Sequence, residues 1–107
     1  MTYDKLKLAL GSMVGYSFAH YSWSNAPSGD YGTFGEYMSN DLRGGNKHVE
    51  KLLTVYIDYF TRDDSGKPKK DIETVLDSVG CPWGLESIQY EEQTGYIHYE
   101  WSCEVVE

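Results

Sequence analysis

The feature that most constrains the fold is the alternating run VEKLLTVYIDYFT at positions 49–61. Successive side chains of an extended chain point to opposite sides, so a period of two predicts a β-strand. One side of this strand would carry Lys51, Leu53, Val55, Ile57 and Tyr59. The other side would carry Leu52, Thr54, Tyr56, Asp58 and Phe60. Because both sides are partly apolar, we expect the strand to lie in the middle of a sheet.

A second alternating pattern closes the sequence and predicts an antiparallel hairpin. Residues 86–92 and 96–106 flank the short turn Gln93-Thr94-Gly95, which contains a glycine. The apolar face of the second arm would consist of Ile97, Tyr99, Trp101, Cys103 and Val105. Its polar face would consist of His98, Glu100, Ser102 and Glu104.

Two further segments have the spacing of helices that bury one face. Apolar residues recur at helical intervals over residues 2–13, and again over residues 68–79, where Gly80 ends the pattern. Shorter β-prone segments lie at 16–23 and 31–38. The resulting order α-β-β-β-α-β-β predicts one α+β domain over the whole chain, 1–107, with two helices packed on a single antiparallel-rich sheet.

The charge of the chain is unevenly distributed and disfavours nucleic-acid binding. Of the net charge of -8, residues 1–53 contribute nothing, with five bases and five acids, whereas residues 54–107 carry four bases and twelve acids. Binding to a phosphate backbone requires clustered Lys and Arg, and none follows residue 70. The simplest interpretation of the acids is a solvated surface that keeps the protein in solution.

Nothing in the sequence points outside the cytoplasm. No apolar run approaches the ~18 residues that a membrane span needs, and Asp4, Lys5 and Lys7 interrupt the N-terminal segment, unlike a secretory signal. We expect Cys81 and Cys103 to be reduced, buried thiols, although the sequence leaves a disulfide between them open.

The residue types that carry catalysis or bind metals form no recognisable site. His20, His48 and His98 lie in three different elements, and no spacing marks a third ligand beside the strand pair His98 and Glu100. Neither cysteine lies in a catalytic signature, and no nucleophile elbow, phosphate-binding loop or dinucleotide fingerprint is present. We therefore predict a protein that is not an enzyme and uses no catalytic residue, cofactor or metal.

The loop at 39–47 is polar, rich in glycine and more basic than its surroundings. A solvated hairpin loop is the simplest interpretation. Its residues Asp41, Leu42, Arg43 and Lys47 could also reach the acidic face of a neighbouring copy, in a head-to-tail contact that closes a ring. Surface charges would steer such an assembly more than hold it together.

The order of these segments resembles a family of small proteins encoded in the tail and neck modules of long-tailed bacteriophages and prophages. The resemblance covers nearly the whole chain and rests on the following segments: MTYDKLKLAL, WSNAPSGDYGTFGEY, VEKLLTVYIDYFTRD, KKDIETVLDSVG and ESIQYEEQTGYIHYEWSCEVV. It is a likeness of pattern and order rather than of a single motif. The element order is similar to that of tail terminator, or tail completion, proteins.

This resemblance implies a structural role in the virion, after synthesis in the cytoplasm of the bacterial host. Such proteins have a small α+β fold and assemble with copies of themselves as a ring, commonly a hexamer. The ring caps the tail tube and contacts the neck or connector proteins, while DNA passes through without being bound specifically. By position, the subunit contacts would come from the 39–47 loop and the strand at 49–61. The family offers no catalytic residue, and the resemblance implies no cofactor and no membrane.

Two interpretations of the acidic half follow. In a ring, Glu91, Glu92, Glu100 and Glu104 would form an acidic lumen or partner face that repels DNA phosphates. Alternatively, the chain is a small acidic inhibitor or regulator encoded by a phage, which mimics DNA and occupies a host nucleic-acid-binding protein. That second class would favour a monomer or dimer with acids spaced along one exposed face.

Overall fold

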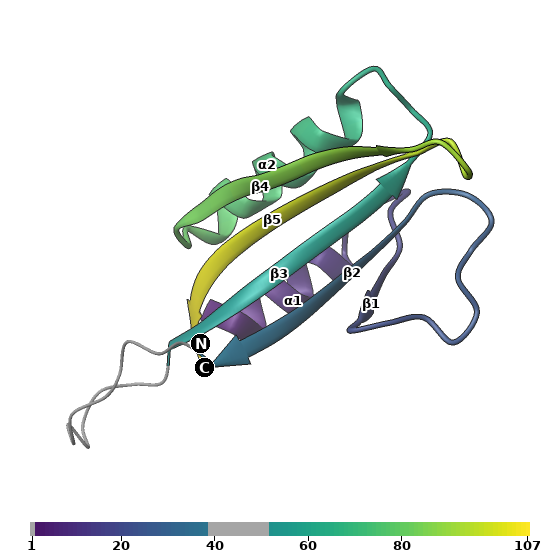
Figure 1. The fold of residues 1–107 in the computed structure, drawn as a ribbon. Helices are drawn as coiled ribbons and strands as arrows, with labels where there is room; N and C mark the ends of the chain where they lie inside the picture. Colours follow the sequence, from purple (N-terminus) through teal and green to yellow (C-terminus); the bar gives the residue numbers. More distant parts are fainter. Residues whose placement is uncertain (1, 39–51) are drawn as a thin grey trace.

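The structure is a computed structural model that describes residues 2–38 and 52–107 (Figure 1). In chain order its elements are α1 (Thr2–Gly11), β1 (Phe18–His20), β2 (Tyr31–Met38), β3 (Leu52–Thr61), α2 (Lys67–Val79), β4 (Trp83–Glu91) and β5 (Tyr96–Val106). The predicted α+β class and the order α-β-β-β-α-β-β are confirmed for these residues.

The five strands form one sheet in the order β1-β2-β3-β5-β4. The short β1 runs parallel to β2, and the other neighbours are antiparallel. Ile57 of β3 lies opposite Phe34 of β2 and Trp101 of β5. The alternating run therefore occupies the middle of the sheet, as predicted.

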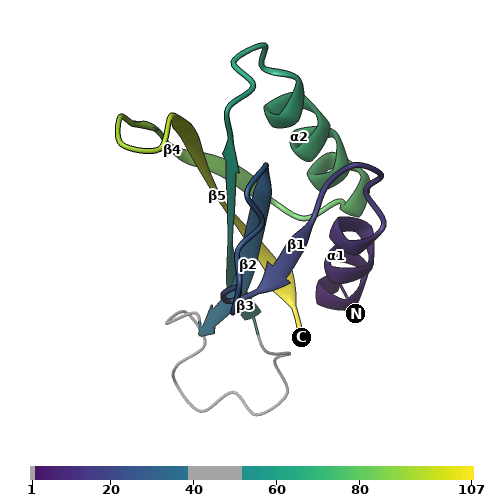
Figure 2. The ribbon, with the colours of Figure 1, turned by 90° about the vertical axis from the view of Figure 1, so that its right-hand side faces the viewer.

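Both helices cover the same side of the sheet, and none of the described residues forms a helix on the other side (Figure 2). The core lies between the helices and the sheet. Its fully buried side chains include Leu6, Leu10, Val55, Ile57, Ile72, Leu76, Trp101 and Val105. The predicted apolar faces of β3 and β5 both belong to this core, so their polar positions form the opposite side, which we call the open face. No described helix has the length and apolar character required to cross a membrane.

The second helix follows its sequence signals closely. Pro68 lies in its first turn, where a missing N–H is tolerated. Gly80 ends it in the left-handed conformation, with φ of 83°, and its N–H bonds back to the carbonyl oxygens of Leu76 and Asp77. A residue with a side chain would be strained there, which explains why the helix ends at this glycine.

Two predicted strand limits are wrong. The segment at 16–23 contains only a three-residue strand, because the chain turns at Tyr21, whose φ is 67°. The ring of Tyr21 occupies the space beside Gly35, where an added Cβ would lie 2.4 Å from a ring carbon. The fourth strand begins at Trp83 rather than at 86, since Trp83 pairs with Cys103 and its indole N–H donates to Asp77 at 2.8 Å.

Candidate interaction surfaces

The open face carries a row of carboxylates contributed by three strands. Asp58 of β3 lies directly opposite Glu100 of β5. In the same row, Ser102 donates a hydrogen bond of 2.6 Å to Glu86 of β4. Burial, together with the charge of Asp58, raises the pKa of Glu100. Crowded carboxylates that face one another in this way destabilise a sheet unless a cation approaches them.

The strands supply no Lys or Arg to these carboxylates. Among the described residues, every Lys and Arg lies outside β1 to β5. A basic side chain on β5, that of His98, lies beside these acids: its Nε2 lies 2.7 Å from Asp58 Oδ1 and its Nδ1 lies 4.0 Å from Glu91 Oε2. The hydrogen bond to Asp58 raises the pKa of His98, although partial burial opposes it. The imidazole stacks on Phe60, with ring centres 4.1 Å apart.

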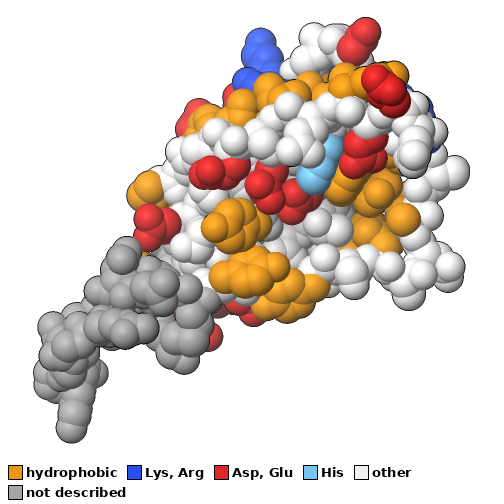
Figure 3. Space-filling model, in the orientation of Figure 1, with side chains coloured by type: hydrophobic (Ala, Val, Ile, Leu, Met, Phe, Trp, Pro, Cys, Tyr) orange, Lys and Arg blue, Asp and Glu red, His pale blue; other side chains and the backbone are white. Residues whose placement is uncertain are grey.

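Exposed tyrosines adjoin the acidic row at its β2 side. The rings of Tyr37 and Tyr56 meet edge to face at 5.4 Å, and Tyr21 meets Tyr37 at 6.3 Å. Figure 3 shows these two kinds of surface together, with acidic side chains in the middle of the open face and apolar ones below them. Tyrosines that combine an apolar ring with a polar tip are enriched at protein interfaces. The open face therefore combines a row of acids with a cluster of exposed tyrosines.

The edge strand β4 is a second candidate surface, since no described strand pairs with its outer side. It is nine residues long and forms one edge of the sheet, whereas β1 at the other edge has three. Leu85, Ile88 and Tyr90 of β4 are exposed on its helix-facing side. A β-bulge interrupts its pairing with β5 between Leu85 and Ser87. Long edge strands with exposed apolar side chains tend to pair with another chain.

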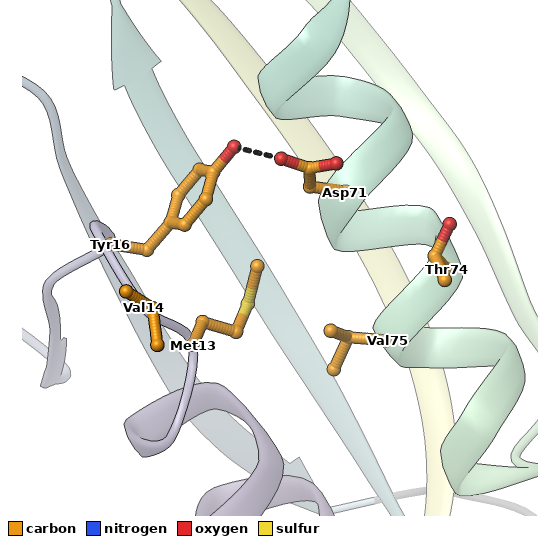
Figure 4. Close-up of a pocket in the computed structure, with 6 residues that line it drawn as sticks. All are labelled: Met13, Val14, Tyr16, Asp71, Thr74 and Val75. Atoms are coloured by element: carbon orange, nitrogen blue, oxygen red, sulfur yellow. Dashed lines mark hydrogen bonds between the residues drawn. The ribbon is translucent and has the colours of Figure 1, made fainter.

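A shallow pocket of about 230 Å³ lies between the segment after α1 and the helix α2 (Figure 4). Its lining consists of Met13, Val14, Tyr16, Asp71, Thr74 and Val75. The Tyr16 hydroxyl donates to Asp71 Oδ2 at 2.5 Å, and Lys67 Nζ lies 2.6 Å from the same oxygen. Both groups bind the same oxygen of the Asp71 carboxylate, and the rest of the lining is mostly apolar.

A polar cluster ties α1 to the strands on the helix-facing side. Glu36 of β2 accepts a hydrogen bond from the Tyr3 hydroxyl at 2.5 Å, and His20 Nε2 lies 2.7 Å from the same carboxylate oxygen. The bond from Tyr3, followed by that from His20, lowers the pKa of Glu36 to about 2. This cluster fastens β1 and the first helix to the sheet.

The two cysteines are free and buried, as expected. Burial raises the pKa of both thiols. Neither therefore offers the exposed thiolate that a nucleophile needs.

The structure places the predicted site residues in three different positions. Glu100 and Glu104 lie on the polar side of β5, as predicted, and Glu91 ends β4 beside His98. Glu92 is exposed in the turn that follows β4. The predicted loop residues Asp41, Leu42, Arg43 and Lys47 lie outside the described residues.

Two open-face acids were missed from the sequence. Asp58 falls on the less apolar side of the run at 49–61, so the alternation could have placed it with Glu100. Glu86 could not be placed in this way, because it lies at the bulge, which shifts the alternation of β4 by one residue.

Within the described part of the chain, no group of three or more His, Cys, Asp or Glu is placed to hold a metal ion. No protein-family model matches the chain, and neither does any curated protein.

Proposed function

We propose that this chain is a tail completion, or tail terminator, subunit of a long-tailed phage or prophage. In this role it forms a ring of identical subunits at the head-proximal end of the tail and catalyses no reaction. The resemblance of the sequence to that family supports the proposal, as does the agreement in element order. The observation that carries it is the one-sided sheet, since both described helices pack on one side and exposed acids and tyrosines remain on the other for contacts between proteins.

The open face and the 39–47 loop supply complementary halves of a head-to-tail contact. The acids Asp58, Glu86, Glu100 and Glu104 have no Lys or Arg on their own strands, whereas the loop carries Arg43 and Lys47. A loop from one subunit that reaches the open face of the next would place cations beside the crowded carboxylates. The same patch repeated around a rotation axis closes a ring.

The tip of the β4–β5 hairpin is the part that we assign to the lumen of the ring. Glu91 and Glu92 stand there, beside the exposed turn. Their carboxylates would repel DNA phosphates and let the genome pass without adhering. Replacing both with Lys should slow or block genome ejection while tails still assemble, and normal ejection would contradict this assignment.

The ring itself is tested by adding the purified protein to tail tubes that lack their completion protein. Negative-stain electron microscopy should show a cap at one end of each tube, and capped tubes should join heads. The variant Asp58→Lys should lose capping, because it puts a cation where the neighbouring loop must bring one. The variant Asp64→Lys has the same charge change on an exposed loop and should cap normally. Uncapped tubes with the native protein would refute the proposal.

The arrangement of acids also supports a second candidate, a DNA mimic. Asp58, Glu86, Glu100 and Glu104 share one face without a Lys or Arg on the strands, as a phosphate-like surface requires. A mimic would displace DNA from a host nucleic-acid-binding protein and would not cap tubes. Capture of such a protein from host extract, followed by release with DNA, would favour this candidate over the ring.

A further inference from the structure

The free edge of β4 has a defined set of backbone groups that point away from the sheet. The carbonyl oxygen of Glu91 accepts a hydrogen bond from the Gly95 N–H at 2.8 Å, so the backbone of Glu91 faces the β5 side. Backbone direction alternates along a strand, so Ser87 and Gln89 also face β5. The N–H and C=O groups of Ile88 and Tyr90 therefore point at the free edge.

The side chains along this stretch leave the edge unprotected. Ile88 is 53% exposed and Tyr90 is 66% exposed, both on the helix-facing side. Natural sheets protect their edges with Lys, Pro or bulges. The sequence of β4, WGLESIQYE, contains neither Lys nor Pro, its bulge is confined to residues 85–87, and its two acids, Glu86 and Glu91, lie at that bulge and at the end of the strand. The regular stretch 87–91 is thus a template for another strand.

We propose that β4 pairs with β4 of a second copy, antiparallel and centred on Gln89. In this register Ile88 of each copy lies opposite Tyr90 of the other, and these two residues exchange both of their backbone hydrogen bonds. An aromatic ring beside a β-branched side chain is a favourable pair across strands. Ser87 lies opposite Glu91, where its hydroxyl can donate to the carboxylate.

Other registers satisfy fewer of these groups. A shift by one residue sets an outward-facing backbone group against an inward-facing one, so hydrogen bonds are lost. Centring on Ile88 places Tyr90 opposite Glu86, within the bulge. Centring on Gln89 pairs both outward-facing residues inside the regular stretch and sets no two carboxylates of that stretch opposite each other.

This contact is two-fold, and therefore differs from the head-to-tail contact of the proposed ring. A ring that binds a tube at one end and a connector at the other has two different faces. A two-fold contact between its subunits would make those two faces equivalent, so it cannot belong to such a ring. We therefore assign the pairing to the free protein. It does not rest on the proposed function, because it uses the backbone edge of β4, whereas the head-to-tail contact uses side chains of the open face.

A disulfide placed at the two-fold axis tests the register. In the dimer the two Gln89 residues form a pair without backbone hydrogen bonds, with Cα atoms about 4.5 Å apart, which a disulfide can bridge. The variant Gln89→Cys should give a covalent dimer under air and copper–phenanthroline, as each pair of thiols loses two protons and two electrons to oxygen. The variant Gln93→Cys should not, because residue 93 lies in the turn beyond β4, so its two copies would stand near opposite ends of the paired segment, farther apart than a disulfide can bridge. The native chain is the background control, since Cys81 and Cys103 are buried.

A matched pair of lysine variants tests the contact without cross-linking. The variant Ile88→Lys/Tyr90→Lys should raise the dimer dissociation constant at least tenfold in sedimentation equilibrium. The variant Leu8→Lys/Val14→Lys removes two side chains that are 72% and 94% exposed elsewhere, makes the same charge change, and should leave the constant unchanged.

Two results would overturn the pairing: a native chain that stays monomeric at about 1 mM, or equal cross-linking of the Gln89→Cys and Gln93→Cys variants. Either result would leave tube capping unaffected. Conversely, a dimer that fails to cap tubes would refute the ring alone.

Discussion

Replacing Glu100 with glutamine should stabilise the protein at neutral pH. In the folded chain Glu100 lies opposite Asp58, and burial together with that neighbour raises its pKa. A raised carboxyl pKa means that the ionised form is less favourable in the folded state than in the unfolded chain. The penalty is present above the folded pKa and disappears as pH falls below the unfolded value near 4.3.

The size of the effect follows from the register. Side chains directly opposite on an antiparallel pair have Cβ atoms about 5 Å apart. Two unit charges at that separation repel by about 0.8 kcal/mol in water-like surroundings and by about 3 kcal/mol at an effective dielectric of ~20. The side chain of Asp58 is 21% exposed to solvent, and His98 is hydrogen-bonded to the same carboxylate, so water and the imidazole both weaken the repulsion. We therefore expect a gain near the lower figure, about 1 kcal/mol, or about 4 °C in Tm.

Urea denaturation at pH 7 and pH 4, followed by circular dichroism, measures this gain. It should be present at pH 7 and largely lost at pH 4. The variant Glu104→Gln is the control, because it removes one charge from an exposed position of the same strand and should change stability by less than about 0.5 kcal/mol. A Glu100→Gln variant that is less stable than the native chain, or a control that gains as much, would refute the reasoning.

Three further predictions concern the contacts around the sheet. Because the pKa of His98 is raised in the folded chain, protonated His98 stabilises the fold, fully below pH ~6.5 and no longer once the pH has risen through the folded pKa. Unfolding by urea should therefore become easier between pH 6 and 8. This dependence on pH should be weaker in a His98→Phe variant. In the same assay at pH 7, the variant Glu36→Gln should have a free energy of unfolding about 1–2 kcal/mol lower than that of the native chain. The native chain should lose this stabilisation only as pH falls from about 4 towards 2, where Glu36 becomes protonated. The variant Gly32→Ala should lower the free energy of unfolding by about 1–3 kcal/mol, because the new Cβ would lie 2.4 Å from the Phe18 ring, whereas Gly84→Ala, with open space at its Cβ, should not.

The sequence predicted those elements whose signal is local and regular. In β3 the odd positions Leu53, Val55, Ile57 and Tyr59 are all buried, as predicted. Their strict alternation can be recognised within the segment itself, without information about the neighbouring strands. The second helix was equally predictable, since its apolar stripe and the Gly80 that ends it are both local features of the sequence.

The elements that were misjudged depend on distant residues. Aromatic composition suggested a long strand around residue 20, yet Tyr21 turns the chain so that its ring can fill the space beside Gly35. The limits of β4 were hidden for a different reason. Its helix-facing residues Trp83, Leu85 and Ile88 are spaced by two and then by three, because the bulge adds a residue that no turn signal marks. Pairing with β5, rather than local propensity, decides where this strand begins.

The two candidate surfaces differ in charge, so ionic strength should affect them in opposite ways. The open face has carboxylates without Lys or Arg on the strands, and a basic loop from another copy would bind it less well in salt. At the β4 edge the paired side chains Ile88 and Tyr90 are uncharged, whereas the chains as a whole repel, each with a net charge of -8. Salt screens that repulsion and should strengthen the dimer. If sedimentation shows the dimer weakening as salt rises from about 20 to 500 mM, charged groups hold it together, and the pairing of β4 edges is wrong.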